Sequence, residues 1–353
     1  MMERVDSEMM AAAIAAARDH YPHPNPRVGA VVVTGDGRVV GRGGHSGPGS
    51  PHAEVLALAE AGPAARGASL YVTLEPCAHY GQTPPCTDAI VAAGIARVVA
   101  ALEDPDSRVG GRGFAALRGS NVEVVTGVES AQAQELDPGY FQHRRTGRPR
   151  VTLKAAMTLD GQVAAADGTS QWITSIDARR DAHLLRSAHD AVMIGAGTLL
   201  ADDPALTVRL DGFVGPQPLP VVVAGLRPVP TVRHVFERAA LAFSPHELDI
   251  PAEVVVLPDS SGQQVDLAAM LDVLGSRGIV DLLVEGGPQL ATSFWRLDLV
   301  DHGVLYLAGA LAGGKGRGMF DGSFLNLADL QAVHFTRIEQ IGPDIRIDFE
   351  KAA

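Results

Sequence analysis

The sequence predicts an α/β protein made of two domains, and three observations support this. Apolar runs of strand length alternate with short helical patterns along the chain, which is typical of layered α/β folds. A length of 353 residues suits two domains of ordinary size. A basic segment with Gly147 and Pro149 interrupts the alternation. We therefore expect one domain over residues 1–146 and a second over residues 147–353.

The first half is expected to begin with a helix and to continue with strands and helices in turn. Residues 7–19 form an Ala/Met-rich helical pattern that Ser7 can cap. Two β-branched runs, 28–33 and 38–43, are joined by a turn containing Asp-Gly, which predicts a hairpin. The other expected elements are helix 52–62 ending at Gly62, strand 69–75, helix 87–94, strand 96–103, helix 113–119, strand 121–127 and a polar helix at about 129–145.

The second half restarts the same alternation. Its expected elements are strand 150–157, helix 175–190, strand and turn 191–198, strand and turn 219–225, helix 266–278, strand and glycine turn 279–287, helix 288–297, and a strand within 299–309. Residues 226–264 contain several prolines and show no clear pattern.

Composition excludes several classes of protein. The net charge is −12 and the pI about 5.4, so a broad basic face for nucleic-acid phosphates is not expected. The N-terminus has a short alanine-rich stretch with charged residues on both sides, which indicates a helix and not a signal peptide. No apolar run reaches the roughly 18 residues that a membrane span requires. We expect a cytoplasmic protein with no nucleic-acid partner and no membrane partner.

The only two cysteines of the chain, Cys77 and Cys86, follow His52 and lie nine positions apart. Zinc prefers thiolate and imidazole ligands, and a catalytic zinc ion keeps one position open for water. Prolines before His52 and Cys86 indicate that each stands near the start of a helix, where free N–H groups help to hold a thiolate. We predict one zinc ion per chain, bound by His52, Cys77 and Cys86. Glu54 would carry the proton from water to a leaving amine, as in zinc deaminases.

A second interpretation of these residues is a zinc site that only stabilises the fold. Such a site normally has four protein ligands, and His79 lies between the cysteines as a candidate fourth. The two cysteines could also meet by chance. His-Ala-Glu at 52–54 together with Glu-Pro-Cys at 75–77 favours the catalytic site.

The spacing of the cysteines separates classes of deaminase. Nucleic-acid and cytidine deaminases carry Pro-Cys-x-x-Cys, whereas eight residues stand between Cys77 and Cys86. The matching segments are HPNPRVGAVVV (23–33), PHAEVLAL (51–58), YVTLEPCAHYGQTPPCTDAI (71–90) and DPDSRVGGRG (104–113). In order and spacing they resemble the deaminase domain of the bifunctional riboflavin-biosynthesis protein.

This resemblance implies a cytidine-deaminase-like α/β/α domain in the first half. It also implies that Asn25 and His45 contact the substrate. An Asn between two prolines otherwise serves a turn. Where the family often has a basic residue before TPPC, this chain has Gln82.

Four segments of the second half point to a reductase. They are LKAAMTLDGQVA (153–164), SQWITS (170–175), GAGTLLADDPALTVR (195–209) and LVEGGPQLATSF (283–294). The last predicts a strand, a glycine turn and a helix N-terminus, which can bind phosphate but can also be an ordinary turn. GGKGRG (313–318) is either a phosphate contact or a surface loop. No G-x-G-x-x-G pattern is present, so a Rossmann site is not indicated. Together the four segments resemble the reductase domain of the same bifunctional family, which implies a dihydrofolate-reductase-like α/β domain that uses NADPH.

The same resemblance implies roles for individual residues of the second half. The cofactor contacts would be Ala156, Trp172, Thr198, Asp202, Gly286, Gly287, Pro288, Gln289, Leu290, Ala291 and Thr292. The substrate contacts would be Ser170, Arg186, Leu206, Arg209 and Glu285. Arginine suits a phosphate because its guanidinium makes bidentate bonds, although an exposed helix position would equally explain Arg186. Lys154, Asp202 and Glu285 are the ionisable candidates near the hydride step, and the catalytic assignment falls on Lys154 and Asp202.

We therefore expect a bifunctional enzyme of riboflavin biosynthesis, active on a small-molecule pyrimidine nucleotide. The first domain would deaminate 2,5-diamino-6-ribosylamino-4(3H)-pyrimidinone 5′-phosphate with zinc, and the second would reduce the ribosyl chain to ribityl with NADPH. A homo-oligomer is also expected. The alternatives are a nucleic-acid or nucleoside zinc deaminase with an accessory nucleotide-binding domain, and a zinc-stabilised scaffold without activity. The cysteine spacing and the acidic charge oppose the first alternative, and the intact motif residues oppose the second.

Overall fold

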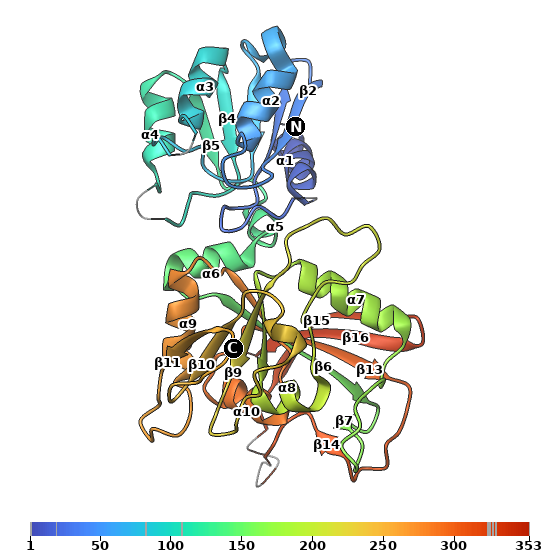
Figure 1. Cartoon of the computed structure of the whole chain (residues 1–353). Helices are drawn as coiled ribbons and strands as arrows, with labels where there is room; N and C mark the ends of the chain where they lie inside the picture. The colour runs from blue at the N-terminus through green and yellow to red at the C-terminus, as the bar shows by residue number, and fades with distance from the viewer. Residues whose placement is uncertain are drawn as a thin grey trace. The chain divides into compact units, whose positions relative to one another are not determined.

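The structure, a computed structural model, describes residues 2–18, 20–81, 83–106, 109–322, 326, 328 and 330–352. The chain divides into two compact units, Met1–Gly147 and Arg148–Ala353, and each is described by itself (Figure 1). Among the described residues, no helix combines the length and the apolar character needed to cross a membrane.

The first unit is built on a five-stranded sheet with the strand order β2-β1-β3-β4-β5. β1 is antiparallel to β2 and β3, whereas β3, β4 and β5 are parallel. The predicted hairpin is therefore confirmed. The strands are β1 Gly29–Val33, β2 Val39–Gly44, β3 Ser69–Val72, β4 Arg97–Ala100 and β5 Glu123–Thr126. The helices are α1 Met2–Arg18, α2 Ala53–Ala61, α3 Cys86–Ala93, α4 Arg112–Gly119, α5 Ser130–Gln134 and α6 Pro138–Thr146, with the 3-10 turn η1 at Gly62–Ala65.

Helices cover both faces of this sheet, so the unit has three α/β/α layers. Alanines of α1 and α5 pack with strand residues in one apolar cluster. On the other face α2 lies so close that a Cβ at Gly43 would stand 2.1 Å from the Ala53 carbonyl oxygen. A Cβ at Gly29 would likewise stand 2.0 Å from the carbonyl oxygen of Ala13 in α1. Glycine in the strands and alanine in the helices thus set the close layer spacing that brings the N-terminus of α2 to the sheet.

Two details of the first unit differ from the sequence prediction. α1 begins at Met2, so Ser7 lies inside the helix and the prediction that it caps the helix is wrong. The polar helix expected at about 129–145 is two helices, because Pro138 starts a new one. The Asp137 carboxylate accepts the Tyr140 N–H and caps this second helix.

The second unit contains a nine-stranded sheet in the order β11-β10-β9-β8-β12-β6-β13-β16-β15. All pairs from β11 to β13 are parallel, and β16 and β15 add an antiparallel edge. The strands are β6 Arg150–Thr158, β8 Ala191–Gly195, β9 Leu219–Val223, β10 Leu241–Ser244, β11 Glu253–Val256, β12 Asp281–Val284, β13 His302–Ala308, β15 Val333–Ile341 and β16 Asp344–Lys351. A small separate sheet pairs β7 Gln162–Ala164 with β14 Arg317–Gly318.

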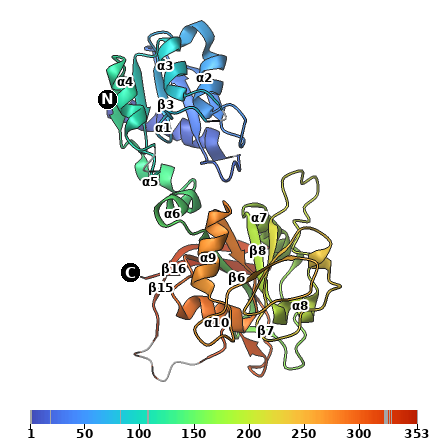
Figure 2. The same ribbon diagram turned by 60° about the vertical axis from the view of Figure 1, so that its left-hand side comes forward.

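Helices also cover both faces of the larger sheet (Figure 2). α9 Leu267–Ser276 and α10 Pro288–Arg296 pack on one face with Phe243 and Leu282. On the opposite face, α7 Ile176–Ser187 and α8 Ala196–Asp202 contribute to two smaller apolar clusters. Parallel strands buried on both faces are typical of α/β folds. Both α/β predictions are confirmed by this architecture.

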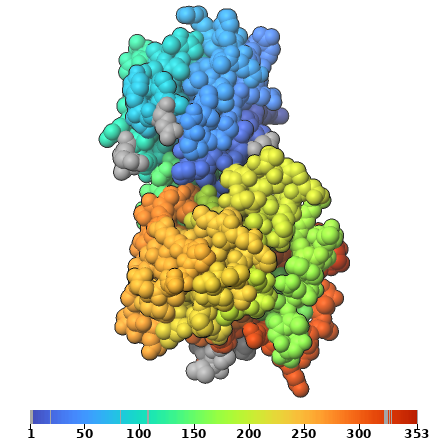
Figure 3. Space-filling view, in the orientation of Figure 1, coloured from blue at the N-terminus to red at the C-terminus, as the bar shows by residue number. Residues whose placement is uncertain are grey.

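Residues 226–264, for which the sequence predicts no pattern, contain the short strands β10 and β11 and the 3-10 turn η2 His234–Phe236. This amber segment covers much of one face of the second unit (Figure 3). The sequence also predicts no element beyond residue 309. In the structure, β15 and β16 form a hairpin in this part of the chain. Most of β15 is exposed, so the alternation that marks a half-buried strand is missing there.

Candidate active sites

A metal-binding group forms where two helices begin beside the end of β3. His52 is the N-cap of α2 and Cys86 is the first residue of α3, while Cys77 lies in the turn after β3. One ligand atom from each of these residues lies within 4.8 Å of the others. The His52 Nδ1 atom is 3.1 Å from the Cys86 Sγ atom and 3.6 Å from the Cys77 Sγ atom. Two sulfur donors and one imidazole nitrogen fit zinc, and three protein ligands leave a position for water.

The group of three does not include His79, which is exposed. Among the described residues, the four-ligand structural site therefore lacks its fourth ligand. Thr83 instead places its hydroxyl oxygen 3.3 Å from the Nε2 atom of His52. A partner on the second ring nitrogen fixes the orientation of a ligand histidine. Gln82, next to Thr83, lies outside the described residues.

The two thiols share a proton when no metal is bound. The Cys86 S–H group donates toward Cys77 and lowers the pKa of Cys77 to about 4, with further stabilisation of that thiolate by His52. The same neighbouring thiolate and burial raise the pKa of Cys86. A metal ion that takes both sulfurs as thiolates must displace this shared proton, so metal binding is linked to pH.

Glu54 stands in the first turn of α2 and is buried, with 3% of its surface exposed. Burial raises the pKa of this carboxyl to about 7. A group whose pKa is near the working pH can both accept and donate a proton, which is the requirement for a proton shuttle. A neighbouring zinc ion would shift the balance toward the carboxylate.

Asn25 and His45 lie beside the metal-binding group. The Asn25 Nδ2 atom is 2.9 Å from the His45 Nε2 atom, and the His45 Nδ1 atom is 3.2 Å from the Pro51 carbonyl oxygen. Because a carbonyl only accepts, the neutral ring carries its proton on Nδ1 and accepts the Asn25 amide at Nε2. The His45 ring meets the His52 ring edge-on at 5.1 Å. This network fixes the direction of the Asn25 amide.

Glu75 is a buried residue of this site that the sequence interpretation missed. Its carboxylate accepts the backbone N–H groups of Asp104, Gly111, Gly113 and Phe114 at 2.8–3.3 Å. A Cβ at Gly113 would stand 1.9 Å from the Pro76 carbonyl oxygen, so this position must be glycine. The backbone at residue 104 and at residues 111–114 thus holds the chain directly before Cys77. An acidic residue in Glu-Pro-Cys was the only available signal.

The second unit contains a cavity of about 1930 Å³ at the carboxyl ends of β6, β8 and β12. Nearly all residues expected to bind cofactor or substrate line it. They are Lys154, Ala156, Ser170, Trp172, Arg186, Thr198, Asp202, Leu206, Arg209, Glu285, Gly286, Gly287, Pro288, Gln289, Leu290 and Thr292. Ala291 does not line the cavity, since its side chain is 2% exposed and packs in the core below α10.

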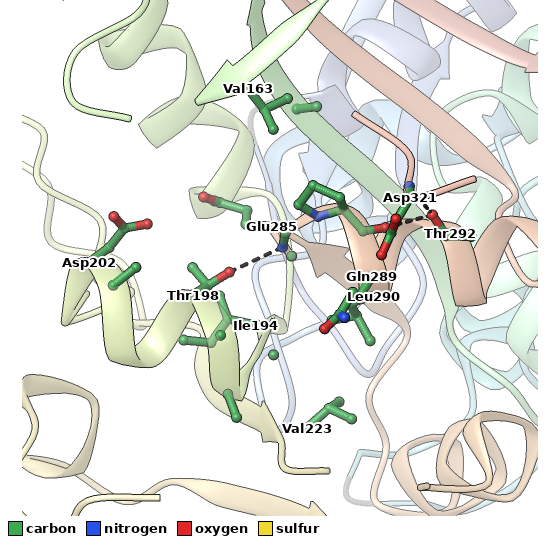
Figure 4. Close-up of a pocket in the computed structure, with 18 of the residues that line it drawn as sticks. Val163, Ile194, Thr198, Asp202, Val223, Glu285, Gln289, Leu290, Thr292 and Asp321 are labelled. Carbon is green, nitrogen blue, oxygen red and sulfur yellow. Dashed lines mark hydrogen bonds between the residues drawn. The ribbon is translucent and has the colours of Figure 1, made fainter. Parts of the chain in front are cut away.

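Two threonines hold the glycine turn that opens α10 (Figure 4). The Gly287 N–H donates to the Thr198 hydroxyl at 3.1 Å. The Thr292 hydroxyl donates to the Pro288 carbonyl and accepts the Asp321 N–H, each at 2.7 Å. A helix N-terminus that opens onto a cavity suits a phosphate-bearing cofactor.

The charged residues of the cavity form a connected group around Glu285. The Arg186 guanidinium binds its carboxylate through Nε at 2.6 Å and Nη2 at 2.9 Å, and the Lys154 Nζ atom lies 3.7 Å away. Burial alone would raise the pKa of Glu285, but Arg186 and Lys154 hold it well below its usual range. Glu285 is therefore a carboxylate at neutral pH. Asp202 stands apart from this group and accepts the Ser170 hydroxyl at 3.1 Å.

The GGKGRG segment is held in place by the Asp160 carboxylate. This group accepts the backbone N–H groups of Ala312, Gly313 and Gly314 at 2.8–3.0 Å. Gly316, Arg317 and Gly318 line the large cavity. The segment thus presents one cation, Arg317, to the space where a cofactor would lie.

Fold and sites together define a zinc-dependent deaminase joined to a reductase of the dihydrofolate-reductase-like class. Residues 3–102 match the family described as cytidine and deoxycytidylate deaminase zinc-binding region. Residues 149–347 match the family described as RibD C-terminal domain.

Curated relatives match nearly the whole chain. The riboflavin biosynthesis protein RibD of Escherichia coli (strain K12) is 41% identical over 341 residues, which cover 92% of each chain. RibD of Aquifex aeolicus (strain VF5) is 40% identical over 99% of this chain and 100% of its own. The solved structure of Acinetobacter baumannii RibD, form 2, has a TM-score of 0.92 at 35% identity, with 100% of both chains covered. The chain belongs to the RibD family of bifunctional riboflavin-biosynthesis enzymes. It is a deaminase and a reductase, and its cofactors are zinc and NADPH.

Proposed function

We propose that the chain deaminates 2,5-diamino-6-ribosylamino-4(3H)-pyrimidinone 5′-phosphate and then reduces the ribosyl side chain of the product to ribityl. The observation that carries the proposal is the convergence of His52, Cys77 and Cys86 beside the buried Glu54. A solved structure from Thermotoga maritima supports the choice of substrate. It is described as a diaminohydroxyphosphoribosylaminopyrimidine deaminase/5-amino-6-(5-phosphoribosylamino)uracil reductase, and it matches at 34% identity with a TM-score of 0.89 over 100% of both chains.

In the deamination, water adds to the ring carbon that carries the amine, and ammonia leaves. His52, Cys77 and Cys86 would hold the zinc ion, which would lower the pKa of that water. Glu54 takes the proton from water and passes it to the nitrogen of the leaving amine, so that it ends the cycle unchanged. Asn25, whose amide is fixed by His45, orients the ring in the site.

In the reduction, NADPH supplies the hydride. The glycine turn from Gly286 to Thr292, together with Ala156, Trp172, Thr198 and Asp202, would bind the cofactor. Ser170, Arg186, Leu206, Arg209 and Glu285 would bind the substrate. Lys154 and Asp202 are the ionisable groups that we assign to the proton that accompanies the hydride.

A comparison of substrates tests this proposal. The purified chain with zinc is supplied in turn with the diamino pyrimidine nucleotide, cytidine, deoxycytidylate and single-stranded DNA, and ammonia is measured. We expect ammonia release from the diamino pyrimidine nucleotide alone. Release from cytidine or DNA, with none from the diamino nucleotide, would show that the chain is a deaminase of the alternative class.

We further propose that the boundary at residues 146/147 separates domains that fold independently. Each of the two compact units has its own sheet and apolar core. A fragment from Thr146 to the C-terminus should therefore be soluble, bind NADPH without zinc and reduce the deaminated nucleotide, while releasing no ammonia from the diamino form. A folded fragment that binds no NADPH at millimolar concentration would show that the cofactor site is misplaced, and an unfolded fragment would refute the independence of the units.

We also propose that the chain is cytoplasmic and homo-oligomeric. β15 stands at the edge of the nine-stranded sheet and exposes 54% of Phe335 and 64% of Ile338. Exposed apolar side chains on an edge strand form a surface that natural proteins usually cover. Light scattering on the purified chain tests the homo-oligomer, and a monomer mass at micromolar concentration would contradict it.

A further inference from the structure

A smaller cavity of about 390 Å³ adjoins the large cavity of the second unit, since Lys154, Trp172, Arg179, Arg186 and Arg209 line both. The smaller cavity is strongly basic. Its charged side chains are those of Lys154, Arg179, Arg180, Arg186, Arg209 and Asp211, and it also contains His183. A basic recess beside the cofactor cavity is suited to the phosphate end of the substrate, which the proposed function requires to bind here.

Arg186 has three of its five N–H donors engaged within the chain. Its Nε and Nη2 atoms bind Glu285, and its Nη1 atom donates to the Thr207 carbonyl oxygen at 3.0 Å. Arg209 is less committed, with one long contact of 3.4 Å from its Nη1 atom to the Thr207 hydroxyl. Burial lowers the pKa of Arg209, and the nearby Arg186 adds to this effect. Arg209 therefore keeps donors available for an anion, and a second donor beside it would strengthen the binding.

His183 of α7 is placed to be that donor. The backbone N–H of Arg209 donates to its Nδ1 atom at 3.3 Å, so Nδ1 must carry a lone pair. The neutral ring then has its proton on Nε2. No hydrogen-bond partner of Nε2 is found in the part of the chain that the structure describes, and the ring lines the basic cavity. Burial and the cations Arg186 and Arg209 lower the pKa of His183 to about 4, so the ring is neutral near pH 7.

We propose that His183 is a specificity-determining residue of the reductase, whose Nε2–H donates to the substrate phosphate while its Nδ1 holds the Arg209 backbone in place. This inference rests on the proposed function, because it requires a substrate that bears a phosphate. It assigns one side chain two tasks at once. The ring recognises the phosphate directly, and it positions the arginine that neutralises it.

Two substitutions separate these tasks. His183→Asn can keep an acceptor near the position of Nδ1 but has no donor at the position of Nε2. His183→Gln can place an amide N–H near Nε2 but loses the acceptor for Arg209. Leu184→Asn is the matched control, since Leu184 is the next residue of α7, is 51% exposed and does not line the smaller cavity.

The experiment measures KM and kcat for the deaminated nucleotide and for the same compound without its phosphate, with NADPH and the full chain. A hydrogen bond to a charged group predicts that His183→Asn raises KM for the phosphorylated compound about 10- to 100-fold. KM for the compound without phosphate should change far less, and His183→Gln should recover part of the loss. Because the donor is neutral, the effect should persist from pH 6.5 to pH 8.

Three results would count against the inference or against the proposed function. If the wild-type chain oxidises NADPH with the phosphorylated compound and His183→Asn alters both KM values equally or neither, His183 does not read the phosphate and the inference is overturned. If the wild-type chain oxidises NADPH with neither compound, the proposed function itself fails. A change caused by Leu184→Asn of the same size would attribute the effect to the helix and not to the imidazole.

Discussion

Glu54→Gln is expected to lower ammonia release by about 10²–10⁴-fold while the protein keeps its zinc and its fold. Glutamine has nearly the same shape as glutamate but cannot take a proton from water. The carboxyl is buried, so bulk water cannot easily substitute for it. The measurement is ammonia release from the diamino nucleotide, with zinc content measured on the same sample.

Glu60→Gln provides the control, since Glu60 lies exposed on the same helix α2. It should leave ammonia release unchanged. NADPH oxidation with supplied deaminated nucleotide should survive Glu54→Gln. Near wild-type ammonia release by Glu54→Gln would remove this residue from the mechanism.

Cys86→Ser is expected to cause the second large effect, a loss of zinc. Serine offers a weaker ligand in place of a thiolate at the first residue of α3, and His52 and Cys77 alone do not complete the set. We expect zinc affinity to fall by more than the roughly 10- to 100-fold that loss of an outer-shell partner causes. Metal analysis after dialysis against a chelator measures the effect.

Thr83→Val gives the graded comparison, because it removes only the hydroxyl that lies 3.3 Å from the Nε2 atom of His52. Its loss of affinity should stay within about 10- to 100-fold. Zinc binding by the wild-type chain should weaken as pH falls, since protons compete for the thiolates and the imidazole. Full retention of tightly bound zinc by Cys86→Ser would refute the ligand set.

The metal-binding group was predictable because its parts are side chains with a distinctive chemistry. His52, Cys77 and Cys86 each stand beside a proline or a helix start, and zinc chemistry restricts which side chains can act together. Glu75 was missed because its partners are not side chains. Its four partners are backbone N–H groups 29 to 39 residues away, and backbone groups carry no sequence signal.

The arrangement of charged residues in the reductase cavity could also not be predicted from the sequence. Arg186 and Glu285 are 99 residues apart, and only the folded sheet shows that they bind one another. The sequence suggested that Arg186 binds phosphate, and the structure shows that its Nε and Nη2 atoms also bind Glu285. His183 has no motif of its own. Its importance depends on a backbone N–H from Arg209 and on the cavity beside it.

The alternation of strands and helices predicted the fold class, but it did not predict the short or exposed elements. β10 and β11 have four residues each within a proline-rich segment. β15 is exposed along most of its length, so its two faces do not differ in burial as those of a half-buried strand do. The helix break at Pro138 was readable in principle, since proline favours the first position of a helix.

The central claim is that one chain performs two consecutive reactions, with deamination first. The most direct measurement mixes the wild-type chain, zinc, NADPH and the diamino nucleotide, and follows ammonia and NADPH together in time. The account predicts that ammonia appears without delay, that NADPH oxidation follows after a lag, and that the two amounts become equal at completion. NADPH oxidation without ammonia release, or ammonia release that never leads to NADPH oxidation, would contradict it.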